Sequence, residues 1–280
     1  MPTPFQRLAD MELNFRQLLL VTLLYLLPAF QALLPVEDPD LWWHLRTGQW
    51  IIEHGQVPFQ DPFSVYGAGK PWIAYSWLYE ILVYGLFRAF GLVGIVWFTV
   101  VMVTLIALAL HCLVRRAKLP FLMEIIVVAL ALSSMKPIYS PRSWLFSILF
   151  FAVELNVALR VRSGGKPALL MALPLIFVLW ANLHIQFSYG VAVLGIFAFE
   201  SLREALRRSD ARGENVEAIP LGPMLATVIG CVLAILVNPY HYRLIFVIFE
   251  YATQTGAFQN VQEFHPLFFR ALADWFILAL

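Results

Sequence analysis

Long apolar runs recur along this chain, and they limit its fold more strongly than any other feature. A membrane-spanning helix needs about 20 mostly apolar residues. The composition agrees, because 61% of the residues are hydrophobic and only 13% are charged, whereas about 25% are charged in soluble domains. The sequence therefore predicts an all-α, polytopic transmembrane helical bundle with about seven to eight spans. We expect the spans near 18–34, 92–114, 120–135, 143–160, 167–182, 187–205 and 220–237, with a partial span at 270–280.

Lysine and arginine predict the orientation of these spans, because positive charge is retained on the cytoplasmic side. If the aromatic-rich segment 73–90 lies along the membrane instead of crossing it, twelve of the 19 lysines and arginines fall on the cytoplasmic side. If it crosses, ten of those twelve move outside. We therefore expect a cytoplasmic N-terminus and an external loop at 35–91. This loop would hold two interfacial helices, Asp40–His54 and Ile73–Phe90, the first beginning at Asp40 as N-cap and ending at Gly55.

The same topology gathers the remaining polar motifs on the external face. They follow the ends of separate apolar runs, at 136–142, 182–186, 238–243 and 260–266 within the external segment 238–269. One face of a plasma membrane, or of the inner membrane in a bacterium, would therefore carry the chemistry. The charged residues Glu154, Glu200 and Arg203 are expected near span ends.

Other features exclude some classes of protein. The net charge of +1 gives no information on nucleic-acid binding, but the sequence has no basic run with interleaved aromatic residues, so we expect no nucleic-acid partner. The two cysteines, Cys112 and Cys231, lie inside apolar runs and are typical of buried hydrophobic residues. The final apolar segment, 271–280, is too short to cross, so the last helix is expected to be truncated or the chain to be part of a longer protein.

Acidic and aromatic side chains open the expected external loop. Asp38 and Asp40 flank Pro39, and such a pair can bind a divalent cation such as Mg²⁺ or Mn²⁺ or supply a general base. The alternative is that they only cap the next helix. Trp42 and Trp43 can stack on sugar rings or anchor the chain at the interface. His44 lies four residues after Asp40, and so either joins the acidic site or has a structural role.

Further candidates for substrate binding come from the other external motifs. Arginine and lysine here would suit a lipid-linked phosphate, the alternative being ordinary contact with lipid headgroups. Amides at span ends would line a wet cavity, because unsatisfied amides are costly in the membrane. The candidate substrate-binding residues are Glu37, Trp42, Trp43, His44, Arg46, Asp61, Lys136, Arg142, Asn182, His184, Gln186, Asn238, His241, Arg243 and Glu263.

Several motifs resemble the GT-C superfamily of membrane glycosyltransferases. They are Asp-Pro-Asp-Leu-Trp-Trp-His-Leu-Arg-Thr-Gly from Asp38, Val-Pro-x-x-Asp-Pro-Phe-Ser from Val57, Ser-Trp-Leu-x-Glu from Ser76, Asn-Leu-His from Asn182 and Asn-Pro-Tyr from Asn238. They are similar to stretches in an uncharacterised bacterial group of that superfamily, although Pro39 separates acidic residues that are adjacent in most relatives. The resemblance covers essentially the whole chain.

The resemblance implies a reaction on the external face. A sugar would pass from a polyprenyl-phosphate donor to a lipid, glycan or protein acceptor, by a single displacement that inverts the anomeric carbon. Asp40, or otherwise Asp38, would be the general base. Two rival functions fit a polytopic chain: a transporter or flippase for a lipid-linked or small solute, and a non-catalytic scaffold of the cell envelope. A transporter predicts ionisable residues at mid-membrane depth and internal repeats.

Overall fold

The computed structural model describes residues 15–33, 36–209, 217–253, 269–270, 275–276 and 278. Within these ranges the regular structure is helical, apart from two isolated bridges in the loop after α3. The helices are α2 (Phe15–Gln31), α3 (Leu41–His54), α4 (Trp77–Val114), η1 (Arg115–Ala117), α5 (Phe121–Ser134), η2 (Lys136–Ile138), α6 (Trp144–Arg162), η3 (Pro167–Met171), α7 (Ala172–Leu183), α8 (Phe187–Ser209), α9 (Leu221–Ile235) and α10 (Arg243–Thr253).

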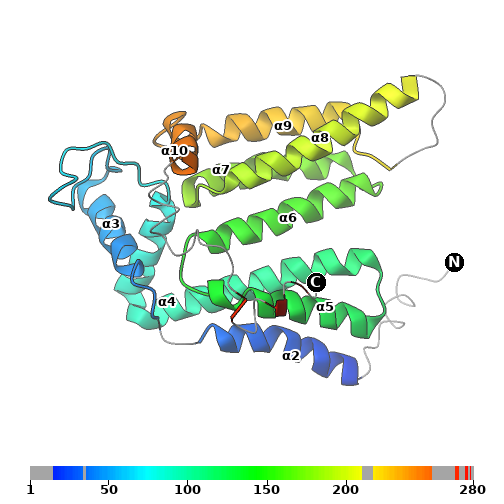
Figure 1. Cartoon of the computed structure of the whole chain (residues 1–280), viewed down its shortest axis with the longest axis horizontal. Coiled ribbons are helices and arrows are strands. Elements are labelled where there is room, and N and C mark those ends of the chain that lie inside the picture. The colour runs from blue at the N-terminus through cyan, green and yellow to red at the C-terminus, as the bar shows by residue number, and fades with distance from the viewer. Residues whose placement is uncertain are drawn as a thin grey trace.

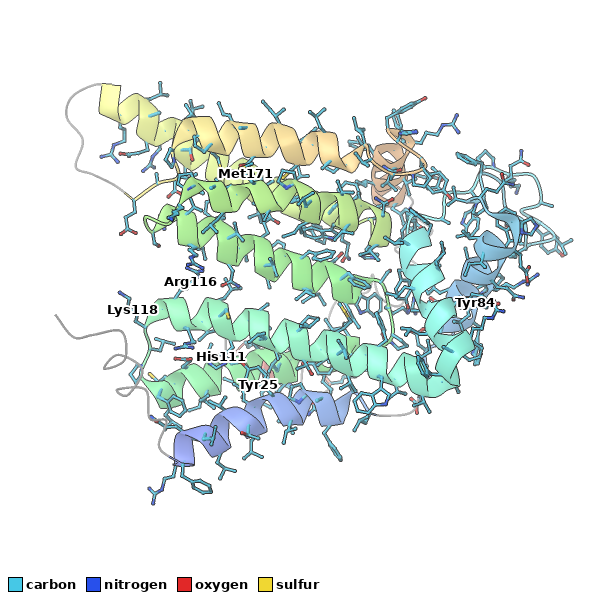
Figure 2. The ribbon with its side chains drawn as sticks, turned by 180° about the vertical axis from the view of Figure 1, so that it is seen from behind. Tyr25, Tyr84, His111, Arg116, Lys118 and Met171 are labelled. Atoms are coloured by element: carbon cyan, nitrogen blue, oxygen red, sulfur yellow. The ribbon has the colours of Figure 1, made fainter. Side chains whose placement is uncertain are left out.

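The longer helices lie side by side as a bundle (Figure 1). Helices α3 and α10, with the first turns of α4, cover one end, which we call the α3 end. Arg116 and Lys118 mark the opposite end in Figure 2, and Tyr84 lies beside α3. The predicted helical bundle is therefore confirmed for the described residues.

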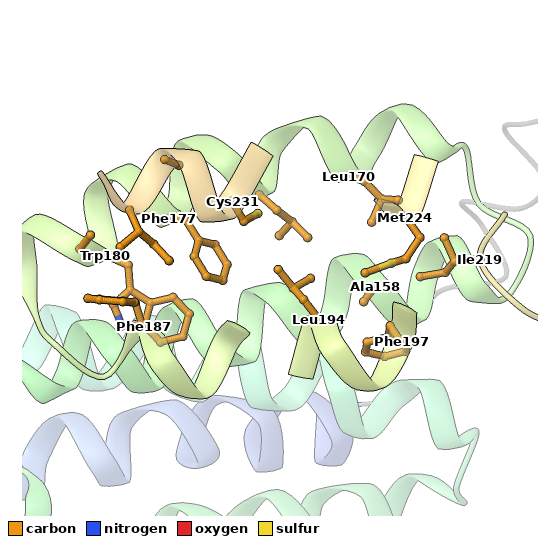
Figure 3. Close-up of a cluster of buried hydrophobic side chains, with 14 of the residues drawn as sticks. Ala158, Leu170, Phe177, Trp180, Phe187, Leu194, Phe197, Ile219, Met224 and Cys231 are labelled. Carbon is orange, nitrogen blue, oxygen red and sulfur yellow. The ribbon is translucent and has the colours of Figure 1, made fainter. Parts of the chain in front are cut away.

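Apolar packing holds this arrangement. One cluster joins α6 to α9 through side chains that include Phe177, Trp180, Leu194 and Cys231 (Figure 3). A second cluster joins α3, α4 and α6 and includes Leu41 and Leu145. Because α6 contributes to both clusters, the α3 end is fixed to the rest of the bundle.

Helix α4 changes direction at Gly91. This residue has φ 60° and ψ −151°, a backbone conformation that essentially only glycine adopts. The expected interfacial helix Ile73–Phe90 begins instead at Trp77, and it runs through the break into the expected span 92–114. The sequence-based boundary at residue 91 is thus a bend within one helix.

Each expected span between residues 15 and 237 corresponds to helix. Two helical segments, Trp77–Ala117 and Trp144–Arg162, are long and apolar enough to cross a membrane. Shorter apolar helices cover Phe15–Gln31, Phe121–Ser134, Pro167–Leu183 and Leu221–Ile235. Helix α10 lies in a segment for which we expected no helix. Most of the expected partial span 270–280 lies outside the described residues.

Candidate functional site

The polar motifs meet at the α3 end of the bundle. The loop 55–76, the turn between α5 and α6, the turn between α7 and α8 and the turn between α9 and α10 all lie there (Figure 1). Tyr240 illustrates this convergence, because its hydroxyl donates to the Pro58 carbonyl at 2.8 Å and accepts from the Ala74 amide at 3.1 Å. Segments up to 182 residues apart therefore form one surface.

Asp38, Asp40 and Arg142 form an ion cluster. The Arg142 Nε donates to Asp38 Oδ2, and its Nη1 lies 2.6 Å from Asp40 Oδ2. The side chains of Asp38 and Arg142 are 7% and 14% exposed, against 50% for Asp40. Burial acts to lower the pKa of Arg142, but hydrogen bonds and the charges of both aspartates raise it above its usual value.

Asp40 begins α3 as expected, but its side chain does not cap the helix. Its carboxylate binds Arg142 instead, and its amide donates to Asp38 Oδ1 at 3.0 Å. The described residues contain no group of three or more histidine, cysteine, aspartate or glutamate side chains placed to hold a metal ion. Asp38 and Asp40 share the Arg142 guanidinium in the described structure, and a divalent cation at this pair stays a prediction.

A cavity of about 290 Å³ opens between α3, the loop 61–76 and the start of α4. Five aromatic side chains line it: Trp43, Phe63, Trp72, Tyr75 and Tyr251. Its polar lining includes His44, Asp61, Ser64, Ser76 and Glu80. Aromatic faces and a few polar groups in a concave site are typical of small-molecule binding.

His44 and Glu80 form a hydrogen-bonded pair in the cavity wall. His44 Nδ1 lies 3.1 Å from Glu80 Oε1, and Glu80 is buried. The second carboxylate oxygen, Oε2, is buried without a hydrogen-bond partner in the described structure. The ring of Tyr79 packs edge-on against His44, with centroids 5.1 Å apart. His44 therefore pairs with Glu80 and not with the aspartates, which was one of the two alternatives that the sequence left open.

Asn182, His184 and Asn238 are buried in hydrogen-bonded networks. Asn182 accepts from Trp77 Nε1 at 2.9 Å and donates to the carbonyls of Val178 and Val237. His184 Nδ1 bonds Ser147 Oγ at 2.8 Å, and burial, with the charge of nearby His44, lowers the pKa of His184 to about 3.

Asn238 has an equally structural environment, because its side chain bonds the backbone of its own turn. The turn after α9 is fixed in this way. These networks hold the α3 end together, and none of the three residues lines the cavity.

Trp43 and Asp61 both line the cavity, and their contacts shape its wall. Trp43 packs against Phe63, whereas its neighbour Trp42 packs against Phe87 and does not line the cavity. Asp61 accepts from Ser64 Oγ at 2.7 Å and from the amides of Phe63 and Ser64, and these bonds hold its pKa below the usual range. Asp61 therefore shapes the loop that forms one wall.

The remaining candidates lie outside the cavity lining. Arg46 bonds Gln49 and lies over the Phe63 ring, while Arg243 lies over the Phe59 ring. His241 is exposed and bonds the Leu236 carbonyl. Glu37 and Lys136 are exposed, and Gln186 is half-buried. Glu263 lies outside the described residues. Arg46, Arg142 and Arg243 thus contact different groups in the described structure.

Sequence reasoning missed Glu80 as a site residue. It occurs in the Ser-Trp-Leu-x-Glu motif, and its charge among apolar and aromatic neighbours was the available signal. Glu154 is also placed differently from our expectation. It lies near the middle of α6, is 0% exposed, and neither carboxylate oxygen has a hydrogen-bond partner within the described residues.

Comparisons with known proteins do not assign the chain to a family. No protein-family model, no curated protein and no solved structure matches it. The resemblance to GT-C glycosyltransferases therefore rests on sequence motifs alone and stays a prediction.

Proposed function

We propose that this chain is a polytopic membrane glycosyltransferase that moves a sugar from a polyprenyl-phosphate carrier to an acceptor outside the cytoplasm. The aromatic-walled cavity at the α3 end carries this proposal. Its five aromatic side chains offer faces on which a sugar ring stacks, and its carboxylates and hydroxyls can bond sugar hydroxyls.

Exposed apolar side chains support a membrane setting with more than two spans. Soluble proteins rarely expose large contiguous apolar patches. Here six helices expose large apolar residues near the middle of their length, and lipid would cover them. Examples, from α2, α4, α5, α7, α8 and α9 in turn, are Leu23, Val101, Ile126, Leu175, Ile196 and Ile229.

The distribution of positive charge supports the proposed orientation. Basic residues collect at the end opposite the cavity, where α4 and α6 finish: Arg115, Arg116, Lys118, Arg160, Arg162 and Lys166. With these residues in the cytoplasm, the N-terminus is cytoplasmic and the cavity faces outward. A sugar carried on a lipid phosphate would then approach the cavity from the outer leaflet of a plasma or bacterial inner membrane.

The proposed reaction is a single displacement at the anomeric carbon. The acceptor oxygen forms a bond to this carbon while the bond to the carrier phosphate breaks. The bonding electron pair leaves with the phosphate, and a base on the protein takes the acceptor proton. Mixed polar and aromatic walls hold the two substrates in the geometry that this displacement needs.

One observation favours a transporter as the second candidate. Glu154 is an ionisable group deep inside a helix that is long enough to span, and such residues often mark ion or solute pathways. However, no cavity described here reaches Glu154. The aromatic cavity therefore favours the glycosyltransferase.

Donor turnover by the full chain tests the proposal. The chain would be reconstituted in liposomes of phosphatidylethanolamine and phosphatidylglycerol with undecaprenyl phosphate bearing radiolabelled glucose, mannose or N-acetylglucosamine. We expect chain-dependent release of undecaprenyl phosphate from at least one donor, with a phosphatidylglycerol headgroup hydroxyl or water taking the sugar. A wild-type chain that releases undecaprenyl phosphate from none of these donors would contradict the proposal.

Trp42 and Trp43 provide a matched pair of variants, because both are more than half exposed and only Trp43 lines the cavity. Trp43→Ala should lower turnover about tenfold, since an aromatic stacking contact contributes about 0.5–1.5 kcal/mol beyond its area burial. Trp42→Ala should leave turnover close to wild type. Equal losses in the two variants would make both tryptophans membrane anchors and would remove the support that the cavity gives.

A further inference from the structure

We infer that the His44–Glu80 pair, and not the aspartate pair, accepts the proton of the acceptor hydroxyl. This inference rests on the proposed function and assigns the base within the same site. Both residues line the aromatic cavity, and they come from different helices, α3 and α4. No sequence motif alone joins them, since they lie 36 residues apart.

The hydrogen bond between the two residues sets the state of the imidazole ring. When Glu80 is ionised it can only accept, so His44 Nδ1 then carries the hydrogen in the 3.1 Å contact. In neutral His44 the lone pair then lies on Nε2, which makes no hydrogen bond within the described residues. A carboxylate that fixes one ring nitrogen while the other faces a substrate is the usual arrangement of a histidine base.

The aspartates are less suited to this task. Both carboxylates are bound to Arg142, and neither Asp38 nor Asp40 lines the cavity. A carboxylate that takes up a proton must give up part of its interaction with the guanidinium. We therefore assign Asp38 and Asp40 the role of holding the start of α3 against the turn before α6.

The proton balance of the step is complete. As the acceptor oxygen bonds to the anomeric carbon, its proton passes to His44 Nε2, and the electron pair of the broken bond leaves on the carrier phosphate. The ionised Glu80 stabilises the resulting imidazolium. The second carboxylate oxygen of Glu80, Oε2, has no hydrogen-bond partner within the described structure, so no other donor there binds this carboxylate.

Other ionisable groups lie near His44. Tyr79, from α4, packs on the ring, and Tyr75 lies in the same wall. His184, between α7 and α8, is close enough for the charge of His44 to act on it. Farther out, Arg142 and Asp38 act on Tyr79. These groups stay constant among the variants compared below.

The donor-turnover assay in liposomes tests the inference. His44→Asn should lower turnover at least 100-fold, in line with the usual contribution of general-base catalysis, roughly 10²–10⁴. Asp40→Asn should lower it less than tenfold. His54→Asn is the matched control, because His54 lies on the same helix but is exposed and stacks on Trp50.

Two further readouts separate lost chemistry from lost folding. Imidazole added to the His44→Ala chain should restore part of its turnover, and it should not raise turnover of Asp40→Asn. In Glu80→Gln the acid limb of the pH profile should move to lower pH, because the imidazolium loses its carboxylate partner. Glu53→Gln, on the exposed part of α3, should leave the pH profile unchanged.

The possible outcomes are distinct. An active wild type whose His44→Asn variant keeps its turnover overturns the inference alone, as does an unshifted acid limb in Glu80→Gln. Loss of turnover in Asp40→Asn with retention in His44→Asn returns the base to Asp40. A wild type without turnover on any donor overturns the proposed function, and the inference with it.

Discussion

Arg142 and Asp38 lie 104 residues apart in the chain, yet they form an ion pair that is almost closed to solvent. The pair joins the start of α3 to the turn before α6. Arg142→Gln would leave Asp38 buried without its cation, and removing one partner of a buried pair costs roughly 3–5 kcal/mol. We expect a clear fall in the thermal unfolding midpoint of the detergent-solubilised chain.

Arg46→Gln is the control for this variant, because Arg46 is an exposed arginine at the same end. Its substitution should change the free energy of unfolding by no more than about 0.5 kcal/mol. An Arg142→Gln chain as stable as Arg46→Gln would mean that the ion pair contributes nothing to the fold.

Gly91 tests whether backbone conformation fixes the bend in α4. A Cβ at this position would meet no atom within 4 Å, so the cost of Gly91→Ala comes from the positive φ alone. Such strain costs about 1–3 kcal/mol. Gly85→Ala, in the same helix and equally free of contacts, should instead stabilise by about 0.5–1 kcal/mol. Unfolding midpoints that move in the same direction in both variants would contradict the bend.

Glu154 predicts a stabilising substitution. A buried carboxyl group without hydrogen bonds is costly, so Glu154→Met should raise the unfolding midpoint by removing that cost. Leu155→Met, at the next position, should change it little because the side-chain volume is conserved. A lower midpoint in Glu154→Met would indicate a polar partner for Glu154 and would strengthen the transporter alternative.

His184 predicts how stability depends on pH. Its pKa is about 3 in the folded chain and 6.5 in the reference state, so the unfolded chain binds more protons between these values. This contribution is complete above about pH 6.5 and is lost as pH falls towards 3, with a slope of up to about 1.4 kcal/mol per pH unit. As the pH falls from 7 to 4, the unfolding midpoint should decrease less steeply in His184→Asn than in wild type. Parallel curves would contradict burial of a neutral His184.

Two single cysteines test the orientation. Tyr66 is 92% exposed in the loop after α3, and Ser163 is exposed where α6 ends, at the opposite end of the bundle. In a chain with Cys112→Ser and Cys231→Ala, a membrane-impermeant maleimide added to intact cells should label Tyr66→Cys and not Ser163→Cys. Labelling of both would place the two ends on one side of the membrane and exclude the proposed topology.

Periodic features of the sequence predicted the helices well. The expected span 220–237 is α9, Leu221–Ile235, and Gly55 ends α3 in the left-handed conformation as expected. Helix α10 escaped prediction because it is short and follows a polar turn. The number of spans stays a prediction, because within the described residues length and composition alone identify two candidate spans.

Contacts between distant residues could not be predicted. The motif spacing placed His44 on the same face of its helix as Asp40, but only the fold brings Glu80 to Nδ1 of His44. Asp40 likewise had the position of an N-cap, and the approach of Arg142 from another turn decides what its carboxylate binds. Side-chain partners at the site depend on tertiary packing, which local sequence patterns do not encode.

The bend at Gly91 joins the part of α4 that lines the cavity to the part that lies within the bundle. Tyr79 and Glu80 lie on the outer arm of α4, and Ile95 and Phe98 lie on the inner arm within the same apolar cluster as Tyr79. Because the two backbone torsion angles of Gly91 join the two arms, a small rotation at this residue displaces the Glu80 carboxylate relative to the inner arm. A residue without a side chain thus governs where an acidic group sits eleven positions away.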